Sequence, residues 1–251
     1  MTDELLDIFH ARNGVVSCVG AGGKKSTMFR LAEAHAGRVG ITATAHIEFF
    51  PKTLDATNYI ADENDLLEAI KNDQNSNRIA FAKPSERFGR RSGISVESVQ
   101  AFREAGNFDL MVIKADGARG RFIKAPAEHE PAIAAATDTV ITVVSAKVIG
   151  MSLNDEIAHR VEQLSAVCGL AEGDEIKTSH IARLLSSPSG SLKNTESKRI
   201  IPLINMVDDA KLEAQAREVA LEALEMTDRF DKVVLASMKQ KQCIIDVVTS
   251  Q

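Results

Sequence analysis

The chain has 251 residues, 44% hydrophobic and 26% charged, which is typical of one large soluble α/β domain rather than two comparable domains. A formal net charge of −5 and an aromatic fraction of 4% disfavour nucleic acid as a partner, because neither a positive field nor a stacking platform is present. The acidic N-terminus and the lack of a long apolar stretch predict a cytoplasmic protein with no membrane partner.

Three cysteines are spread along the chain without metal-binding or redox spacing. They are Cys18, Cys168 and Cys243. We expect buried thiols in a reducing compartment rather than disulfides or a zinc site.

Apolar segments rich in β-branched residues alternate with segments of helical periodicity. The predicted strands are 15–19, 39–44, 78–82, 110–113, 139–145, 200–205 and 232–236. The predicted helices are 26–36, 63–71, 95–105, 154–168, 178–185 and 210–225, and 84–93 and 186–197 are expected to be surface loops. This order predicts an α/β fold of three layers with a mostly parallel sheet, in a single domain over residues 1–251.

A glycine-rich turn joins the strand 15–19 to the helix that follows. Its residues are Gly20, Ala21, Gly22, Gly23, Lys24, Lys25, Ser26 and Thr27. Glycines let the backbone approach a phosphate, the helix N-terminus adds partial positive charge, and a lysine adds a full one. We therefore predict a P-loop NTPase-like fold in which these eight residues bind the phosphates of ATP or GTP.

The loop departs from the strict G-x-x-x-x-G-K-[ST] pattern. Cys18 occupies the place of the first glycine, which leaves the shorter G-x-x-G-K form. Lys25 stands where a hydroxyl residue normally follows the lysine, so either Ser26 binds Mg²⁺ or the metal role is weakened. Lys25 also argues against a dinucleotide-binding loop, which requires a small residue at that position.

A second group of polar residues follows the strand 110–113. Asp116 is placed where P-loop proteins hold Mg²⁺ or orient water, although an Asp-Gly turn is a common structural alternative. Arg119 and further cations follow within one loop and favour a phosphorylated or otherwise anionic substrate. His129, between carboxylates and prolines, is a candidate general base or metal ligand, or else a hydrogen-bonding loop residue. The predicted catalytic residues are Asp116, Arg119 and His129, and the predicted metal ligands are Ser26 and Asp116.

The strand 200–205 ends in Asn205, with Asp208 three residues later. This N-x-x-D spacing is typical of residues that bind the base in GTPase-like proteins, but Met206 replaces the usual lysine. A chance pair at a strand end explains the spacing equally well.

Together these motifs resemble the YqeC family over nearly the whole chain. The most specific string is Lys124-Ala125-Pro126-Ala127-Glu128-His129-Glu130-Pro131, and the segments 19–24, 42–47, 115–120 and 205–209 agree with it. The resemblance implies a P-loop NTPase-like fold and an accessory role in the maturation of selenium-dependent molybdenum hydroxylases. Lys25, Lys114 and Met206 stand where the family usually has Thr, Glu and Lys.

Two functions remain open on the sequence. The first is an NTPase or NTP-dependent transferase or ligase that acts on an anionic small molecule. The second is a nucleotide-gated chaperone or scaffold for a hydroxylase apoprotein, with little or no turnover. Lys25 favours the second function, and the cations that follow Asp116 favour the first.

Overall fold

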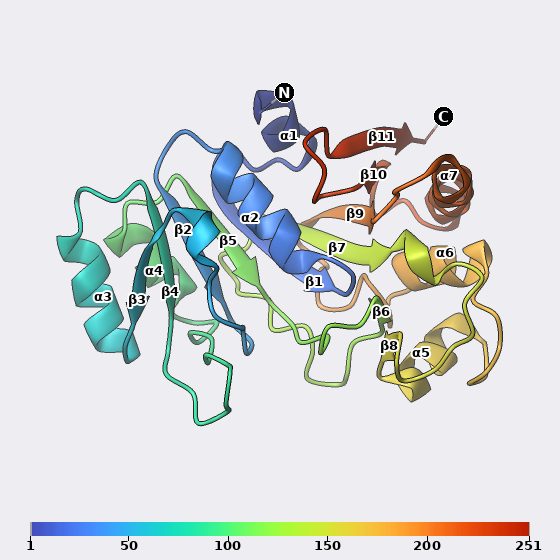
Figure 1. The fold of residues 1–251 in the computed structure, drawn as a ribbon, viewed down its shortest axis with the longest axis horizontal. Helices are drawn as coiled ribbons and strands as arrows, with labels where there is room; N and C mark the ends of the chain where they lie inside the picture. Colours follow the sequence, from blue (N-terminus) through green and yellow to red (C-terminus); the bar gives the residue numbers. More distant parts are fainter. Residues whose placement is uncertain (1, 251) are drawn as a thin grey trace. The chain divides into compact units, whose positions relative to one another are not determined.

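The computed structural model describes residues 2–250 as helices alternating with mostly parallel strands (Figure 1). The predicted α/β class with a mostly parallel sheet is therefore confirmed. The chain divides into two compact units, each built from separate segments. Unit 1 contains the residues up to Cys18, Thr27–Gly117 and Ala132–Thr139, and unit 2 contains Val19–Ser26, Ala118–Pro131 and the residues from Val140 onward. The single domain over 1–251 stays a prediction, and its first and last residues lie outside the described part.

Unit 1 is built on parallel strands in the order β1-β5-β2-β4-β3. Their bounds are β1 (Gly14–Gly20), β5 (Leu110–Lys114), β2 (Val39–Ala43), β4 (Arg78–Ala82) and β3 (Thr57–Ile60). Residues 14–18 of β1 pair with 110–114 of β5, and β2 and β5 are buried along their whole length. Apolar runs without alternation predicted these buried strands. The short edge strand β3 was missed because its polar residues are largely exposed.

The helices of unit 1 are α1 (Thr2–Ile8), α2 (Lys24–Ala34), α3 (Glu63–Asn72) and α4 (Val99–Ala105), with a short η1 (Lys52–Leu54). α3 and α4 pack Leu66 and Phe102 into a core cluster with Phe81 of β4. The rings of Phe81 and Phe102 stack with centroids 4.9 Å apart.

The predicted helix 95–105 begins four residues late, at Val99. The Glu63 carboxylate accepts hydrogen bonds from the Ser95 N–H at 2.7 Å and from the Ser98 hydroxyl at 2.6 Å. Serine side chains that bond in this way compete with helical backbone, so the segment before Val99 is irregular.

Unit 2 contains strands in the order β11-β10-β9-β7 and a small sheet of β6 and β8. Their bounds are β7 (Thr139–Ser145), β9 (Arg199–Asn205), β10 (Lys232–Ala236), β11 (Ile244–Thr249), β6 (Ile123–Lys124) and β8 (Ala158–His159). β9 and β10 are parallel, and β11 is antiparallel to β10. The helices are α5 (Val161–Cys168), α6 (Thr178–Ser186) and α7 (Ala210–Met226), and η2 (Ala146–Val148) is a short 3-10 turn. β11 was missed because most of its residues are only half-buried.

The predicted helix 154–168 is wrong in its first half. Ala158 and His159 pair with β6, and Arg160 has a left-handed backbone (φ 68°), which an α-helix cannot contain. The helix therefore begins at Val161. The three cysteines are free and buried, as expected. Within residues 2–250, no helix has the length and apolar character needed to cross a membrane.

Candidate functional site

The glycine-rich turn has the local structure that the sequence predicts. β1 ends at Gly20, the chain turns through Gly22 and Gly23, and α2 begins at Lys24. All three glycines have positive φ values, of 89°, 85° and 135°. Glycine adopts this region without steric cost, so the turn depends on these residue types. We call residues 20–27 the phosphate loop.

The structure also gives the glycines a packing role that the sequence did not indicate. A Cβ atom on Gly20 would lie 2.2 Å from the Val143 carbonyl oxygen, and one on Gly22 would lie 2.7 Å from the Ser145 backbone nitrogen. The Ala21 N–H donates to the Val143 carbonyl at 2.8 Å, and the Gly22 N–H donates to the Arg121 carbonyl at 3.2 Å. These two N–H groups hold the loop to β7 and to the segment at Arg121 within unit 2, and they do not point to a ligand.

Lys24 is the most unusual side chain of the loop. It is 5% exposed, and its ammonium donates to the Gly20 carbonyl. Lys25 follows it, and the first turn of α2 contains no acidic residue. A cation at a helix N-terminus meets the positive end of the helix dipole, and its burial adds a desolvation cost. Two adjacent lysines thus place positive charge at a helix N-terminus, where a bound anion is favoured.

Asn205 is buried at the end of β9, and the fold uses both ends of its amide. Its Nδ2 donates to the Gly22 carbonyl at 2.8 Å, and its Oδ1 accepts from the Met238 N–H at 3.0 Å. A Cβ on Gly23 would lie 2.0 Å from the same Nδ2. Asn205 thus fixes the shape of the phosphate loop.

The residues after Asn205 face the end of β7. Met206 has a left-handed backbone (φ 61°), and its sulfur accepts from the Ser145 hydroxyl at 3.2 Å. Asp208 pairs with Lys147 at 2.7 Å and accepts from the Ser237 hydroxyl at 2.6 Å. These two hydrogen bonds lower the pKa of the Asp208 carboxyl.

Next to this segment unit 2 has a cavity of about 480 Å³. Its lining includes Phe122, Ile149 and Leu212 as apolar residues, and Lys147 and Lys211 as charged ones. The Phe122 carbonyl accepts from Ser145 and lies 2.8 Å from the position of a Cβ on Gly22. Phe122 therefore lines the cavity and also lies beside Gly22 of the phosphate loop.

Asp116 lies in unit 1, directly after β5, and is 2% exposed. Its carbonyl and that of His46 accept from the Lys114 ammonium at 2.6 and 2.7 Å. Thr44, after β2, donates its hydroxyl to the Ala132 carbonyl at 2.6 Å. Burial and the positive charges of Arg87 and Lys114 lower the pKa of His46. Carboxyl ends of neighbouring parallel strands thus collect the polar residues of unit 1.

The segment after Asp116 crosses into unit 2 and contains both exposed and buried charges. Arg119 and His129 are exposed, whereas Lys124 and Glu130 are buried. The Glu130 carboxylate binds Lys124 at 2.7 Å and Arg160 at 3.1 Å. Sequence reasoning missed Glu130 and Arg160 as partners, because their contact joins residues 30 positions apart.

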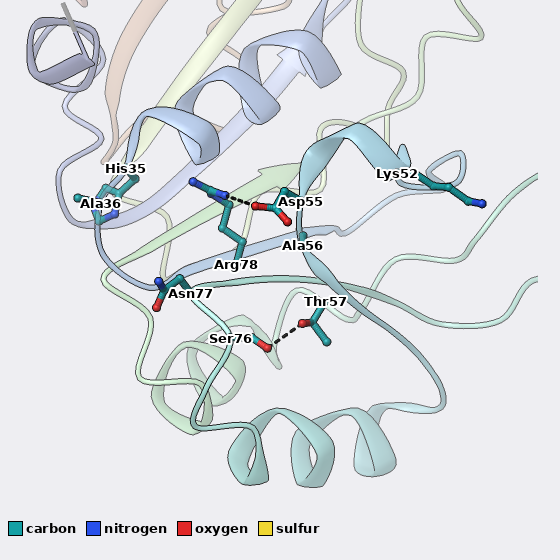
Figure 2. Close-up of a pocket in the computed structure, with 9 residues that line it drawn as sticks. All are labelled: His35, Ala36, Lys52, Asp55, Ala56, Thr57, Ser76, Asn77 and Arg78. Carbon is teal, nitrogen blue, oxygen red and sulfur yellow. Dashed lines mark hydrogen bonds and ion pairs between the residues drawn. The ribbon is translucent and has the colours of Figure 1, made fainter.

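A second cavity, of about 520 Å³, lies in unit 1 and contains none of the predicted site residues (Figure 2). Its lining residues are His35, Ala36, Lys52, Asp55, Ala56, Thr57, Ser76, Asn77 and Arg78. Figure 2 shows Arg78 directed at Asp55, 3.5 Å away, and Thr57 bonded to Ser76 at 2.7 Å. These polar groups bond to one another, so the cavity is a weaker candidate than the phosphate loop.

Comparison with known proteins points to one family. The model of the family described as "YqeC protein" matches residues 16–162, a range that begins in β1 and ends in α5. The chain is also 34% identical over 186 residues to "Uncharacterized protein YqeC" of Escherichia coli (strain K12). That alignment covers 73% of this chain and 72% of the relative.

Proposed function

This chain belongs to the YqeC family, and we propose that it binds ATP or GTP through the phosphate loop at residues 20–27. The observation that supports this most directly is the buried Lys24 at the N-terminus of α2, beside a glycine turn. An ammonium at a helix N-terminus forms charge-assisted hydrogen bonds with an anion, to which the helix dipole adds attraction. A nucleotide phosphate is such an anion.

The local geometry fits a phosphate in some respects and restricts it in others. The first turn of an α-helix presents N–H groups to an anion, but the space beside the Gly23 Cα is occupied by the Asn205 amide. The N–H groups of Ala21 and Gly22 are already bonded to the protein. We therefore assign phosphate binding to Lys24 and the start of α2 rather than to the whole glycine turn.

The base of the nucleotide has a candidate place in the cavity lined by Phe122, Lys147 and Leu212. Its size and its mixture of apolar and charged walls suit a nucleobase. Asn205 is then a positioning residue for the loop instead of a base reader, since its amide is bonded at both ends. Asp208, which forms an ion pair with Lys147, stays a candidate residue for contact with the base.

Mg²⁺ would neutralise charge on the phosphates when bound, with Ser26 in the first turn of α2 as the proposed ligand from the phosphate loop. Asp116, buried in the other unit, stays a separate proposed metal ligand. No group of three or more His, Cys, Asp or Glu side chains in the described part of the chain could hold a metal by itself. The proposed metal therefore depends on bound nucleotide for most of its ligands.

On the family resemblance, we propose that this activity serves the maturation of selenium-dependent molybdenum hydroxylases. The protein is then an NTP-dependent enzyme that acts on an anionic substrate, which the charged segment 116–130 favours. The alternative is a nucleotide-gated scaffold for the hydroxylase apoprotein with little turnover, which Lys25 in place of a hydroxyl residue favours.

Binding and turnover measured on the same protein test these proposals. Calorimetric titration with ATP and with GTP, with and without Mg²⁺, should show saturable binding of at least one nucleotide. Phosphate release at saturating nucleotide then separates an enzyme from a scaffold. The absence of binding for both nucleotides would contradict the proposed function.

A further inference from the structure

We propose that Arg119, His159 and Arg160 form a binding site in unit 2 for a small oxyanion, either a phosphate ester or a carboxylate. The site deepens the proposed function, and its assignment to a second substrate rests on that function. The binding of the anion itself is independent of nucleotide and can be tested separately.

A buried ionic network forms the base of this site. The Lys124 side chain is 1% exposed and pairs with Glu130 at 2.7 Å, while Arg160 approaches the same carboxylate oxygen at 3.1 Å. The Ala127 N–H also donates to that oxygen, at 3.3 Å. Burial alone would raise the pKa of the Glu130 carboxyl, but the bonds from Lys124 and Arg160 outweigh it and lower the pKa to about 2. The carboxylate is therefore fully charged and holds Arg160 in place.

Positive charge gathers around His159. The pairing of β6 with β8 places Lys124 opposite His159, and Arg160 follows His159 in the chain. Burial and the positive charges of Lys124, Arg160 and Arg119 lower the pKa of His159 to about 4, so the ring is neutral at pH 7. The Glu130 carboxylate pairs with both Lys124 and Arg160, and a bound anion would add a second negative charge to this group.

The two arginines of the site are held in a backbone conformation that is unusual for their type. Arg160 has a φ of 68° and Arg119 a φ of 49°, in the left-handed region that favours glycine. Arg160 is also the residue immediately before α5, where the helix dipole disfavours a cation. Strained non-glycine residues persist where surrounding structure enforces them, and they are concentrated at functional sites. Arg160 follows His159 directly and the charge of Arg119 acts on the same ring, so the strained backbone and the positive charge coincide.

The position of this segment is tied to the phosphate loop within unit 2. The Arg121 carbonyl accepts from the Gly22 N–H at 3.2 Å, and Phe122 follows with its carbonyl bonded to Ser145. Arg119 is thus two residues away from a direct hydrogen bond to the loop. An oxyanion at Arg119 and Arg160 would be bound in the same unit as the proposed nucleotide, as a second substrate requires.

Arginine is the residue that fits such a ligand. Its planar guanidinium binds phosphate or carboxylate oxygens in pairs, and a neutral histidine adds one N–H donor. Arg160 bonds to Glu130 through Nε, and its guanidinium has further N–H donors on Nη1 and Nη2. Phosphate and citrate are therefore suitable probes for the two possible sources of the oxyanion.

The test is calorimetric titration of the full chain with inorganic phosphate and with citrate at pH 7, without nucleotide. We expect saturable binding of at least one probe, weakened roughly tenfold or more in Arg160→Gly and also weakened in Arg119→Ala. Glycine suits the left-handed backbone at 160, so Arg160→Gly should remain folded. If Arg160→Gly does not fold, Arg119→Ala still tests the site, because Arg119 is exposed and its removal should not disturb the fold. Arg217→Gln removes an equal charge from α7 and should bind like the wild type.

A histidine NMR titration gives an independent readout. The pKa of His159, identified by its loss in His159→Gln, should rise when the bound probe is present, because the anion favours the imidazolium. Lys24→Met should weaken nucleotide binding at least tenfold and leave citrate binding intact, which separates this site from the phosphate loop. Equal affinity in wild type, Arg160→Gly and Arg119→Ala, or no saturable binding of either probe, would overturn the proposal.

Discussion

The side-chain amide of Asn205 donates to the Gly22 carbonyl at 2.8 Å, across 183 positions of sequence. The same amide accepts from the Met238 N–H at 3.0 Å. One buried side chain thus connects the phosphate loop to the ends of β9 and β10. Its removal should change the loop even though Asn205 touches no proposed phosphate ligand directly.

We predict that Asn205→Ala lowers the affinity for ATP, GTP and inorganic triphosphate by similar factors. The loop loses its clamp, and the Gly22 carbonyl and Met238 N–H lose a partner, which costs about 1–3 kcal/mol of stability. Calorimetry with the three ligands and a urea melt provide the measurement. A base reader would behave differently: its removal would alter the ATP to GTP preference and leave triphosphate binding unchanged.

Gly23→Ala should destabilise the protein more than Gly150→Ala. Both glycines have positive φ, of 135° and 82°, but a Cβ at 23 would lie 2.0 Å from Asn205 Nδ2, whereas nothing lies within 4 Å of one at 150. Both variants add backbone strain, which is greater at φ 135° than at 82°, so their difference in unfolding free energy reports the collision together with this extra strain. Equal melting temperatures for both would show that the loop relaxes around the methyl group.

The stability of unit 2 should fall in two steps on acidification. The folded pKa of His159 is about 4 and that of Glu130 about 2, both below their ordinary values of 6.5 and 4.5. Lowered pKa values mean that protonation favours the unfolded state, so stability is lost from pH 6.5 to 4 for His159 and from pH 4.5 to 2 for Glu130. His159→Gln should remove the first loss, and Glu130→Gln the second.

Urea midpoints at pH 7, 4 and 3 check this prediction. Glu130→Gln should also be less stable than the wild type at pH 7, because the buried Lys124 and Arg160 lose the charged carboxylate. The contribution of the Glu130 pKa shift is on the order of 2–3 kcal/mol. If the stability of both variants changes with pH as that of the wild type does, His159 and Glu130 are not the cause of the loss of stability on acidification.

Asp116→Asn should leave the fold largely intact and remove Mg²⁺-dependent turnover if Asp116 holds the metal. The amide keeps the shape of the side chain and loses the charge that binds Mg²⁺.

His129 is exposed, so His129→Ala should keep the melting temperature and lower turnover if the histidine is a general base. Thermal melts beside kinetics decide the matter: full activity in Asp116→Asn contradicts the metal role, and a lower melting temperature in step with lost activity indicates scaffolding.

Much of the fold was predictable from the sequence, and the reason lies in particular strands. The apolar runs at β2 and β5 are buried throughout, so composition alone identified them. Polar or half-buried strands such as β3 and β11 lack that signal. The start of α4 was misplaced because it depends on the Glu63 carboxylate, which lies more than 30 residues away in sequence.

The candidate site was predictable only where the signal is local. The glycine turn and Lys24 are contiguous, so their spacing indicated a phosphate loop. The role of Asn205 depends on a contact with Gly22, and that of Arg160 on a contact with Glu130. Neither contact leaves a pattern in a single sequence, because both depend on tertiary structure.

The central claim is that Lys24 binds a nucleotide phosphate, and calorimetric titration of Lys24→Met with ATP and GTP tests it most directly. We expect affinity at least tenfold weaker than in the wild type, about 1.4 kcal/mol, and a thermal melt without nucleotide should show that the variant is folded. Lys25→Met is the matched control and should lose less affinity. Unchanged nucleotide affinity in a folded Lys24→Met protein would contradict the account.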